Sequence, residues 1–349
     1  MNRLKKGFVK LGRAVWQRIV KENPGELTIL TKKPRTVFGL LFSWVGFLKE
    51  LTRKVLFFLT RSSRFSYFGG PRAVLRSLVE GLKEQGVAYC LNPWHLRVTD
   101  TVGVLSDVSA LKWALEQKKT GRIKTLVAGP NLVVSPDDHN KIMKDPLIDR
   151  VIVPSEWDKR WWVSFDQYLG QKTVVWPAGV KDVGASDKKG GFCLVYVKNA
   201  PEQLVKKVIH TIWERNVRIR TLHYGRFTHG AYLRLLKKAK FVIYLSAFES
   251  QGIALLEAWM ANVPTLAWSC GQYSNEGHEV FDEKIGAPYL TEETGSIFKG
   301  VDDFQVTFTD FLSHLEFFSA RKYVLGNLTD RIAAVNYLRI IDNAKKDEE

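Results

Sequence analysis

The sequence has few cysteines, and they are not arranged to bind zinc. Its three cysteines, Cys90, Cys193 and Cys270, lie far apart in a chain of 349 residues and form no Cys-x-x-Cys pair. An odd, sparse set of this kind argues against both a disulfide scaffold and a zinc site, and is typical of a reducing cytoplasm. We therefore expect a cytoplasmic protein without a structural metal.

Acidic residues are also scarce at the start of the chain. Residues 1–60 contain thirteen Lys or Arg and three Glu, so they carry +10 of the formal net charge of +16. Apolar side chains recur there at the spacing of one helical stripe, at Leu4, Phe8, Leu11, Val15 and Ile19. A basic amphipathic helix is typical of segments that bind a membrane surface or dock on a partner.

No apolar run near the N-terminus is long enough to span a bilayer. Residues 36–48 are thirteen residues without a charge, whereas a spanning helix needs about 20. We expect residues 1–50 to attach peripherally to a membrane surface; the alternative, that they pack on the protein's own surface, stays open. Nucleic acid is not an expected partner, because zinc-finger spacing, a helix-turn-helix pattern and an RNP-like strand are all absent.

Short apolar runs alternate with helical patterns through the rest of the chain. This alternation predicts parallel sheets covered on both faces by helices, and the length suits two domains. We expect an α/β protein with two Rossmann-like lobes that face a central cleft. The predicted units are an N-terminal extension (1–52), a first lobe (53–180), a linker (181–191), a second lobe (192–318) and a C-terminal helix (319–349).

The most informative stretch is 241–269, in which a buried strand, a short loop, a helix and another strand follow one another. The loop carries Glu249, Gly252 opens the helix, and Glu257 lies on that helix eight residues after Glu249. Backbone N–H groups at a helix start are unpaired and attract anions, which suits a phosphate. The residues expected to provide them are Ser250, Gln251, Gly252 and Ile253.

This stretch resembles the Glu-x7-Glu signature of retaining glycosyltransferases with the GT-B fold, those of family 4 in particular. The resemblance implies that Glu249 lies at the reaction centre and that Glu257 binds the ribose hydroxyls of a nucleotide-sugar donor. For Glu257, the alternative is a carboxylate that only caps its own helix. In the same way, Gly69 and Gly70 resemble the glycine-rich loop that approaches the donor diphosphate or the acceptor.

The sequence departs from that family at the residues that bind the diphosphate. The family places an Arg and a Lys after the first strand of the second lobe, whereas this chain has Lys198 alone. Arg226 is a candidate for the second charge. The alternatives are a solvated loop lysine for Lys198 and a surface arginine for Arg226. The candidates on the acceptor side, for which the sequence signal is less specific, are Asn131, His95 and His139. Because Asp-x-Asp is absent, a metal-free site is expected.

The resemblance implies transfer of a sugar, with retention of anomeric configuration, from a nucleotide sugar to a hydroxyl of a glycan, lipid-linked or protein acceptor. A glycoside hydrolase that uses the two glutamates is one rival. It would need its carboxyl groups on either side of one bond, about 5 Å or about 6.5–9.5 Å apart. A catalytically inactive GT-B scaffold that binds a membrane or a partner is the other.

Overall fold

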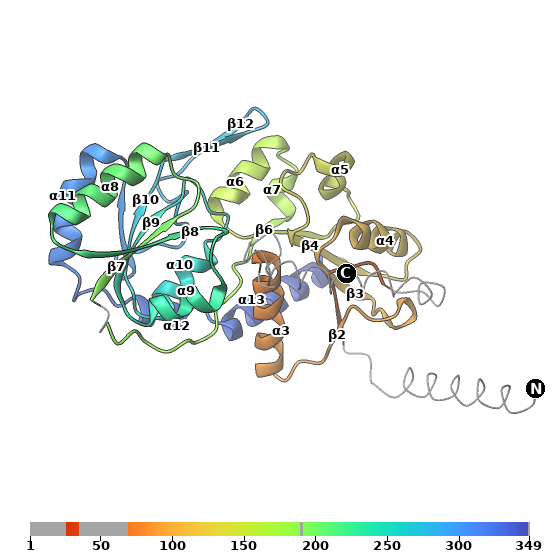
Figure 1. Cartoon of the computed structure of the whole chain (residues 1–349). Helices are drawn as coiled ribbons and strands as arrows, with labels where there is room; N and C mark the ends of the chain where they lie inside the picture. Colours follow the sequence, from red (N-terminus) through yellow and green to blue (C-terminus); the bar gives the residue numbers. More distant parts are fainter. Residues whose placement is uncertain (1–25, 35–68, 189–190, 348–349) are drawn as a thin grey trace, which may run out of the picture.

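The computed structural model describes residues 26–34, 69–188 and 191–347. It has two α/β lobes that lie side by side (Figure 1). The first lobe contains a six-stranded parallel sheet in the order β2-β1-β3-β4-β5-β6. Its strands are β1 (Leu27–Leu30), β2 (Tyr89–Leu91), β3 (Thr101–Ser106), β4 (Thr125–Asn131), β5 (Arg150–Val153) and β6 (Thr173–Val175).

Helices cover both faces of this sheet, because its strands are apolar on both sides. One face packs against α3 (Gly70–Glu84) and α13 (Asp330–Lys346). The other packs against α4 (Val108–Lys119) and the three tryptophans of α6 (Glu156–Phe165). Two single-turn helices, α5 (Asp138–Lys141) and α7 (Leu169–Lys172), complete the lobe.

The boundary predicted for the first lobe at residue 53 is wrong, because β1 lies inside the predicted extension 1–52. All four residues of β1 are at most 3% exposed, and the strand pairs in parallel with both β2 and β3. A run of only four residues, three of them apolar, next to a strongly basic segment did not stand out as a strand. Residues 53–68, with which the first lobe was predicted to begin, lie outside the described residues.

Most of the basic segment predicted to bind membranes, residues 1–50, also lies outside the described residues. In the part of the chain that the structure describes, no helix combines the length and apolarity needed to cross a membrane.

The second lobe contains a five-stranded parallel sheet in the order β13-β10-β9-β7-β8. Its strands are β7 (Phe192–Val197), β8 (Arg218–His223), β9 (Ala239–Leu245), β10 (Thr265–Trp268) and β13 (Gly295–Phe298). One face packs against α9 (His229–Leu236), α10 (Ile253–Met260) and α12 (Ala320–Asn327). The other packs against α8 (Glu202–Glu214) and α11 (Val301–Ser313), the second of which contributes three fully buried phenylalanines.

The chain crosses between the lobes twice, at adjacent places. It leaves the first lobe through residues 176–180 and returns at 328–330, where Val180 pairs with Thr329 and donates its N–H to the carbonyl of Leu328 at 3.0 Å. Helix α13 then packs along α3 in the first lobe (Figure 1). The Asp330 carboxylate accepts two hydrogen bonds from the Arg76 guanidinium, at 2.8 and 3.2 Å. The single helix predicted for 319–349 is therefore two helices: α12 packs in the second lobe and α13 in the first.

A β-hairpin from the second lobe reaches across to the first. It consists of β11 (Gln272–Asn275) and β12 (His278–Phe281) and lies beside α6 (Figure 1). The His278 ring stacks on Phe165 with a centroid distance of 3.7 Å. At the hairpin turn, Ser135 of the first lobe donates a hydrogen bond to the Glu276 carboxylate at 2.7 Å. The hairpin thus connects the lobes on the side away from the double crossing.

The packing of α3 on α13 generates a prediction. A Cβ added at Gly81 would lie 2.0 Å from the backbone carbonyl oxygen of Asp330, so Gly81→Ala must push the two helices apart. We expect a loss of about 1–3 kcal/mol, the usual cost of overpacking, measured as a lower thermal unfolding temperature. Gly326→Ala in α12 is the matched control, because nothing lies within 4 Å of its added Cβ. An equal loss in both variants would contradict this account.

Candidate functional site

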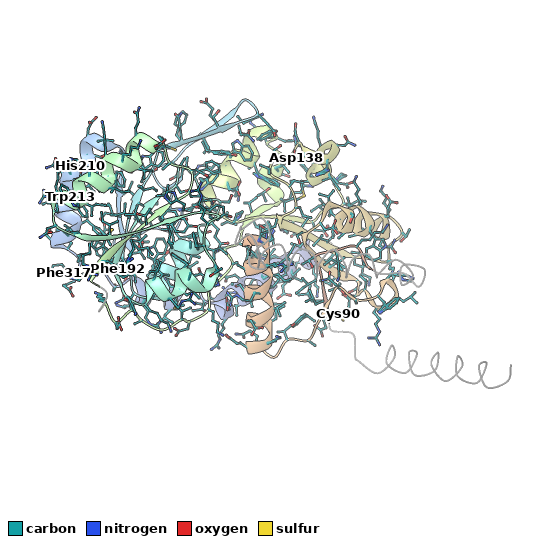
Figure 2. All side chains as sticks on the ribbon, viewed as in Figure 1. Cys90, Asp138, Phe192, His210, Trp213 and Phe317 are labelled. Carbon is teal, nitrogen blue, oxygen red and sulfur yellow. The ribbon has the colours of Figure 1, made fainter. Side chains whose placement is uncertain are left out.

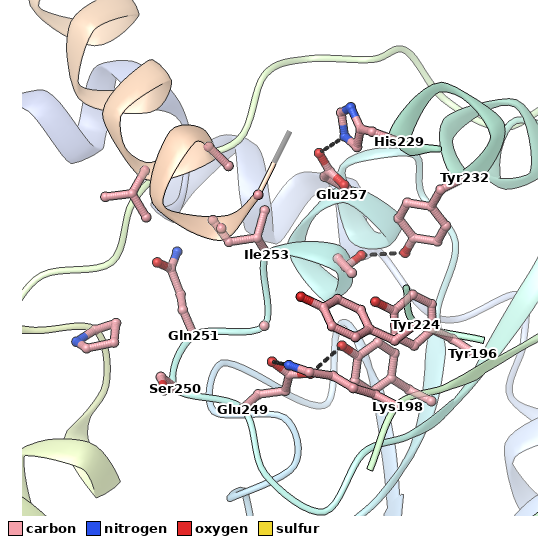
Figure 3. A pocket seen from close by; sticks show the side chains of 18 of the residues that line it. Tyr196, Lys198, Tyr224, His229, Tyr232, Glu249, Ser250, Gln251, Ile253 and Glu257 are labelled. Carbon is pink, nitrogen blue, oxygen red and sulfur yellow. Dashed lines mark hydrogen bonds and ion pairs between the residues drawn. The ribbon is translucent and has the colours of Figure 1, made fainter. Parts of the chain in front are cut away.

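A cavity of about 340 Å³ lies between the lobes, where the carboxyl ends of β7 and β9 meet the start of α10. Figure 3 shows the side chains of most of the residues that line it. The first lobe contributes the start of α3 and the end of β4. From the predicted set, the lining contains Gly69, Gly70, Asn131, Lys198, Glu249, Ser250, Gln251, Gly252, Ile253 and Glu257.

Glu249 lies at the centre of a hydrogen-bonded network. Its residue surface is 6% exposed, and burying a carboxylate costs free energy unless it is paired. Lys198 Nζ lies 2.9 and 2.8 Å from the two carboxylate oxygens, and the Tyr244 hydroxyl donates to Oε1 at 2.7 Å. Burial and the nearby Glu249 raise the pKa of the Tyr244 phenol, so this hydroxyl stays protonated and continues to donate.

The backbone of Glu249 is held by residues from both lobes. Its N–H donates to the carbonyl of Ile285 at 2.9 Å, and its carbonyl accepts a hydrogen bond from the indole N–H of Trp157, also at 2.9 Å. Trp157 belongs to α6 of the first lobe, so the position of Glu249 depends on how the lobes meet. Gly252, three residues on, has φ +77°, a conformation that favours glycine and turns the chain into α10.

Helix α10 directs its N-terminus at the cavity. The N–H groups of Ile253 and Ala254, in its first turn, have no carbonyl within the helix to which they can donate. One turn further, the Glu257 carboxylate is 13% exposed and lies 2.6 Å from His229 Nε2 (Figure 3). A helix start with unpaired N–H groups and a carboxylate one turn away can bind a phosphate and a hydroxyl pair.

Several aromatic residues of the cavity were not predicted. Tyr196 of β7 and Tyr244 of β9 pair in register, and their rings stack with a centroid distance of 4.7 Å. Tyr224 lies under the Lys198 ammonium, 5.0 Å from ring centroid to Nζ. The sequence contained a signal for Tyr196 and Tyr244, because each is the second-to-last residue of its strand. His229 and Tyr224 had no such signal.

Two of the predicted residues, Arg226 and His95, line neither this cavity nor the cavity that adjoins it. Arg226 is exposed, and its neighbours Tyr224, Gly225 and Phe227 line the wall instead. His95 belongs to a 3₁₀ turn in the first lobe, where its carbonyl accepts a hydrogen bond from Arg122. The Gln251 side chain is committed elsewhere: its amide pairs with the backbone N–H and C=O of Ala178 at 3.2 and 2.5 Å, across the lobe junction.

A second cavity, of about 570 Å³, adjoins the first. Asn131 lies in the walls of both, and His139 lies in the second alone. Asp158 of α6 also lines the second cavity, although it is only 7% exposed. Burial without a compensating partner raises the pKa of its carboxyl to about 7.

Metal ligation has no candidate cluster in the described ranges. Within residues 26–34, 69–188 and 191–347, no three His, Cys, Asp or Glu side chains are placed to hold a metal ion.

Comparison with known proteins places the fold. No family model matches the chain, and no curated protein matches it. Among solved structures, it is similar to the apo form of the lipopolysaccharide outer core galactosyltransferase WaaB, with 15% identity and a TM-score of 0.53 over 80% of this chain and 97% of that one. It is also similar to the GtfA/B complex, with 12% identity and a TM-score of 0.50 over 71% of this chain and 58% of that one. The predicted GT-B fold is therefore confirmed.

The buried carboxyl of Asp158 generates a prediction about stability and pH. Its pKa of about 7 in the folded protein lies above the value of about 3.9 for an unfolded chain. Folding therefore favours the protonated form, and stability falls as the pH rises from about 4 through 7. We expect Asp158→Asn to unfold at a higher temperature than the wild type at pH 8, and the gain to disappear near pH 4.

The matched control is Glu156→Gln, an exposed position on the same helix. It should show no gain at pH 8. The assignment would be wrong if Asp158→Asn lowered the unfolding temperature equally at both pH values.

Proposed function

We propose that the protein is a glycosyltransferase that moves a sugar from a nucleotide sugar to an acceptor hydroxyl, with retention at the anomeric carbon and without a metal ion. The observation that carries the proposal is the placement of Glu249, Lys198, Glu257 and the start of α10 around one cavity. The GT-B fold supports it, and the WaaB structure is described as a galactosyltransferase.

The donor is proposed to bind with its ribose at Glu257 and its diphosphate at the start of α10. The N–H groups of Ile253 and Ala254 and the Lys198 ammonium would then stabilise the negative charge that develops on the leaving diphosphate. In the structure Lys198 is paired with Glu249. Binding of a diphosphate to Lys198 would leave the Glu249 carboxylate available for the positive charge that develops on the sugar ring.

The reaction is proposed to need no carboxylate base. The bond between the anomeric carbon and the diphosphate oxygen breaks, and the acceptor oxygen bonds to the same face of that carbon. The acceptor proton passes to the departing phosphate oxygen. The hydrolase alternative is less well supported, because Glu257 is already hydrogen-bonded to His229 and Glu249 is already paired with Lys198.

The lone cation near the diphosphate keeps the inactive-scaffold alternative open. Among the described lining residues of the first cavity, Lys198 is the one Lys or Arg, and its ammonium is already paired with Glu249. A nucleotide sugar that binds without being consumed would favour the scaffold. Product formation that is lost in Glu249→Ala would favour the enzyme.

The role of Glu257 is tested with nucleoside diphosphates and their 2′-deoxy analogues. We expect Glu257→Gln to weaken binding of the ribose form by about 10- to 100-fold, because a hydrogen bond to a charged group contributes about 1.5–3 kcal/mol. The 2′-deoxy form should bind the wild type more weakly, and the substitution should weaken it less than it weakens the ribose form, because one of the two hydroxyls is already absent. Calorimetric titration with nucleoside diphosphates that differ in their nucleobase gives these affinities.

Glu292→Gln, at an exposed glutamate of the second lobe, is the control for this series. The protein is also incubated with a panel of nucleotide sugars. NMR of the anomeric proton in the product then tests both transfer and retention. Inverted products would exclude the retaining mechanism, and equal affinities of wild type and Glu257→Gln for every diphosphate would exclude the proposed donor site.

We also propose that the parts of residues 1–50 on either side of β1 attach the enzyme to a membrane surface, because their sequence pattern is basic and apolar. The expected result is co-sedimentation of the full chain with vesicles containing anionic phosphatidylglycerol, decreasing as salt is raised. Vesicles of phosphatidylcholine alone are the control. Equal binding to both vesicles, or none to either, would contradict the proposal.

A further inference from the structure

The second cavity shares a wall with the first. The residues that line both are Pro130, Asn131, Pro154, Phe248 and Ser250. Phe248 and Ser250 flank Glu249 in the chain, so the shared wall lies next to the carboxylate at the centre of the network. A group bound in the second cavity therefore lies beside the proposed reaction centre.

Aromatic rings form much of the surface of the second cavity. Phe248 of the second lobe and Tyr273 of the hairpin lie with ring centroids 4.9 Å apart, and Tyr273 also packs on Trp157 of α6 at 5.1 Å. Phe248 is 37% exposed although it stands in the cleft between the lobes. Apolar carbon–hydrogen faces of a ring-shaped ligand would pack well on such a surface.

Two polar groups of the second cavity have no hydrogen-bond partner. Asn131 Nδ2 is buried and unpaired. Asp158 is more than nine-tenths buried, and none of the described residues hydrogen-bonds its carboxylate. Ser155 and Asp158 have the spacing of a capping box, yet the Ser155 side chain makes no cap hydrogen bond. Asn131 thus has an unpaired amide group in the wall of the cavity, and Asp158 lines the cavity with an unpaired carboxyl.

The charge of the lining restricts the chemistry of the ligand. The described lining residues include two acidic side chains, Asp138 and Asp158, and neither Lys nor Arg. The Asp138 carboxylate already accepts hydrogen bonds from the backbone of Val134 and Ser135, both at 3.0 Å. A phosphate or carboxylate ligand would meet no fixed cation here, whereas an uncharged polyhydroxylated ligand would meet both a donor and an acceptor.

We propose that the second cavity binds a pyranose ring of the acceptor, with its apolar face on Phe248 and Tyr273 and its hydroxyls hydrogen-bonded to Asp158 and Asn131. The acceptor is then a saccharide or a molecule that ends in one. The inference rests on the proposed function for the direction of transfer, whereas the sugar site itself rests on the cavity.

The site is tested by saturation-transfer NMR on the full chain, in the presence of a saturating nucleoside diphosphate. The probes are the methyl pyranosides of glucose, galactose, mannose and N-acetylglucosamine, with glycerol as an acyclic polyol. We expect transfer to the ring protons of at least one pyranoside and none to glycerol. Asp158→Leu should weaken that pyranoside at least tenfold, and Phe248→Leu should weaken it measurably.

Glu156→Gln, the exposed neighbour on α6, should leave pyranoside binding unchanged. Absence of transfer to every pyranoside, or full retention of binding in Asp158→Leu, would overturn the inference. The two proposals fail separately. If the protein binds a nucleoside diphosphate but no pyranoside, the proposed acceptor site is wrong and the proposed donor site is not. If it binds a pyranoside through Asp158 but consumes no nucleotide sugar, the proposed transferase activity is wrong and the sugar site is not.

Discussion

The arrangement of the cleft depends on the need to pair one buried carboxylate. Glu249 lies in a loop between β9 and α10, and its side chain would be unfavourable there without partners. Its partners come from different elements: Lys198 follows β7, and Tyr244 is on β9 itself. This pairing therefore fixes the loop against the carboxyl ends of β7 and β9. As a result, α10 begins in a defined direction, toward the cavity.

The same loop depends on the contact between the lobes. The Trp157 indole of the first lobe holds the Glu249 carbonyl, and the Gln251 amide pairs with the backbone of Ala178 near the chain crossing. The hairpin makes a second contact through His278 and Glu276. The two lobes are thus in contact around the site, and a motion that separates them must break hydrogen bonds next to Glu249.

The sequence allowed the second lobe and its two glutamates to be predicted, because a buried strand, a loop and a helix there are consecutive in the chain. Lys198 was found for the same reason, as the first cation after β7. The pairing of Lys198 with Glu249 was not predicted, because the two residues are 51 positions apart in the sequence and follow different strands. Strand β1 was missed because it is four residues long. Arg226 was proposed for its charge, whereas its neighbours Tyr224, Gly225 and Phe227 line the cavity.

Glu249 and Asp158 show how the two cavities differ. Both carboxyl groups are buried to a similar extent, at 6% and 7% exposure. Glu249 is satisfied by a cation and a hydroxyl within the chain, so its energetic cost is met by the fold. Asp158 has no such partner, and burial alone raises its pKa. Natural sequences keep such a local conflict mainly where function requires it, and a ligand hydroxyl is the partner that an unpaired, proton-bearing carboxyl beside aromatic rings can accept.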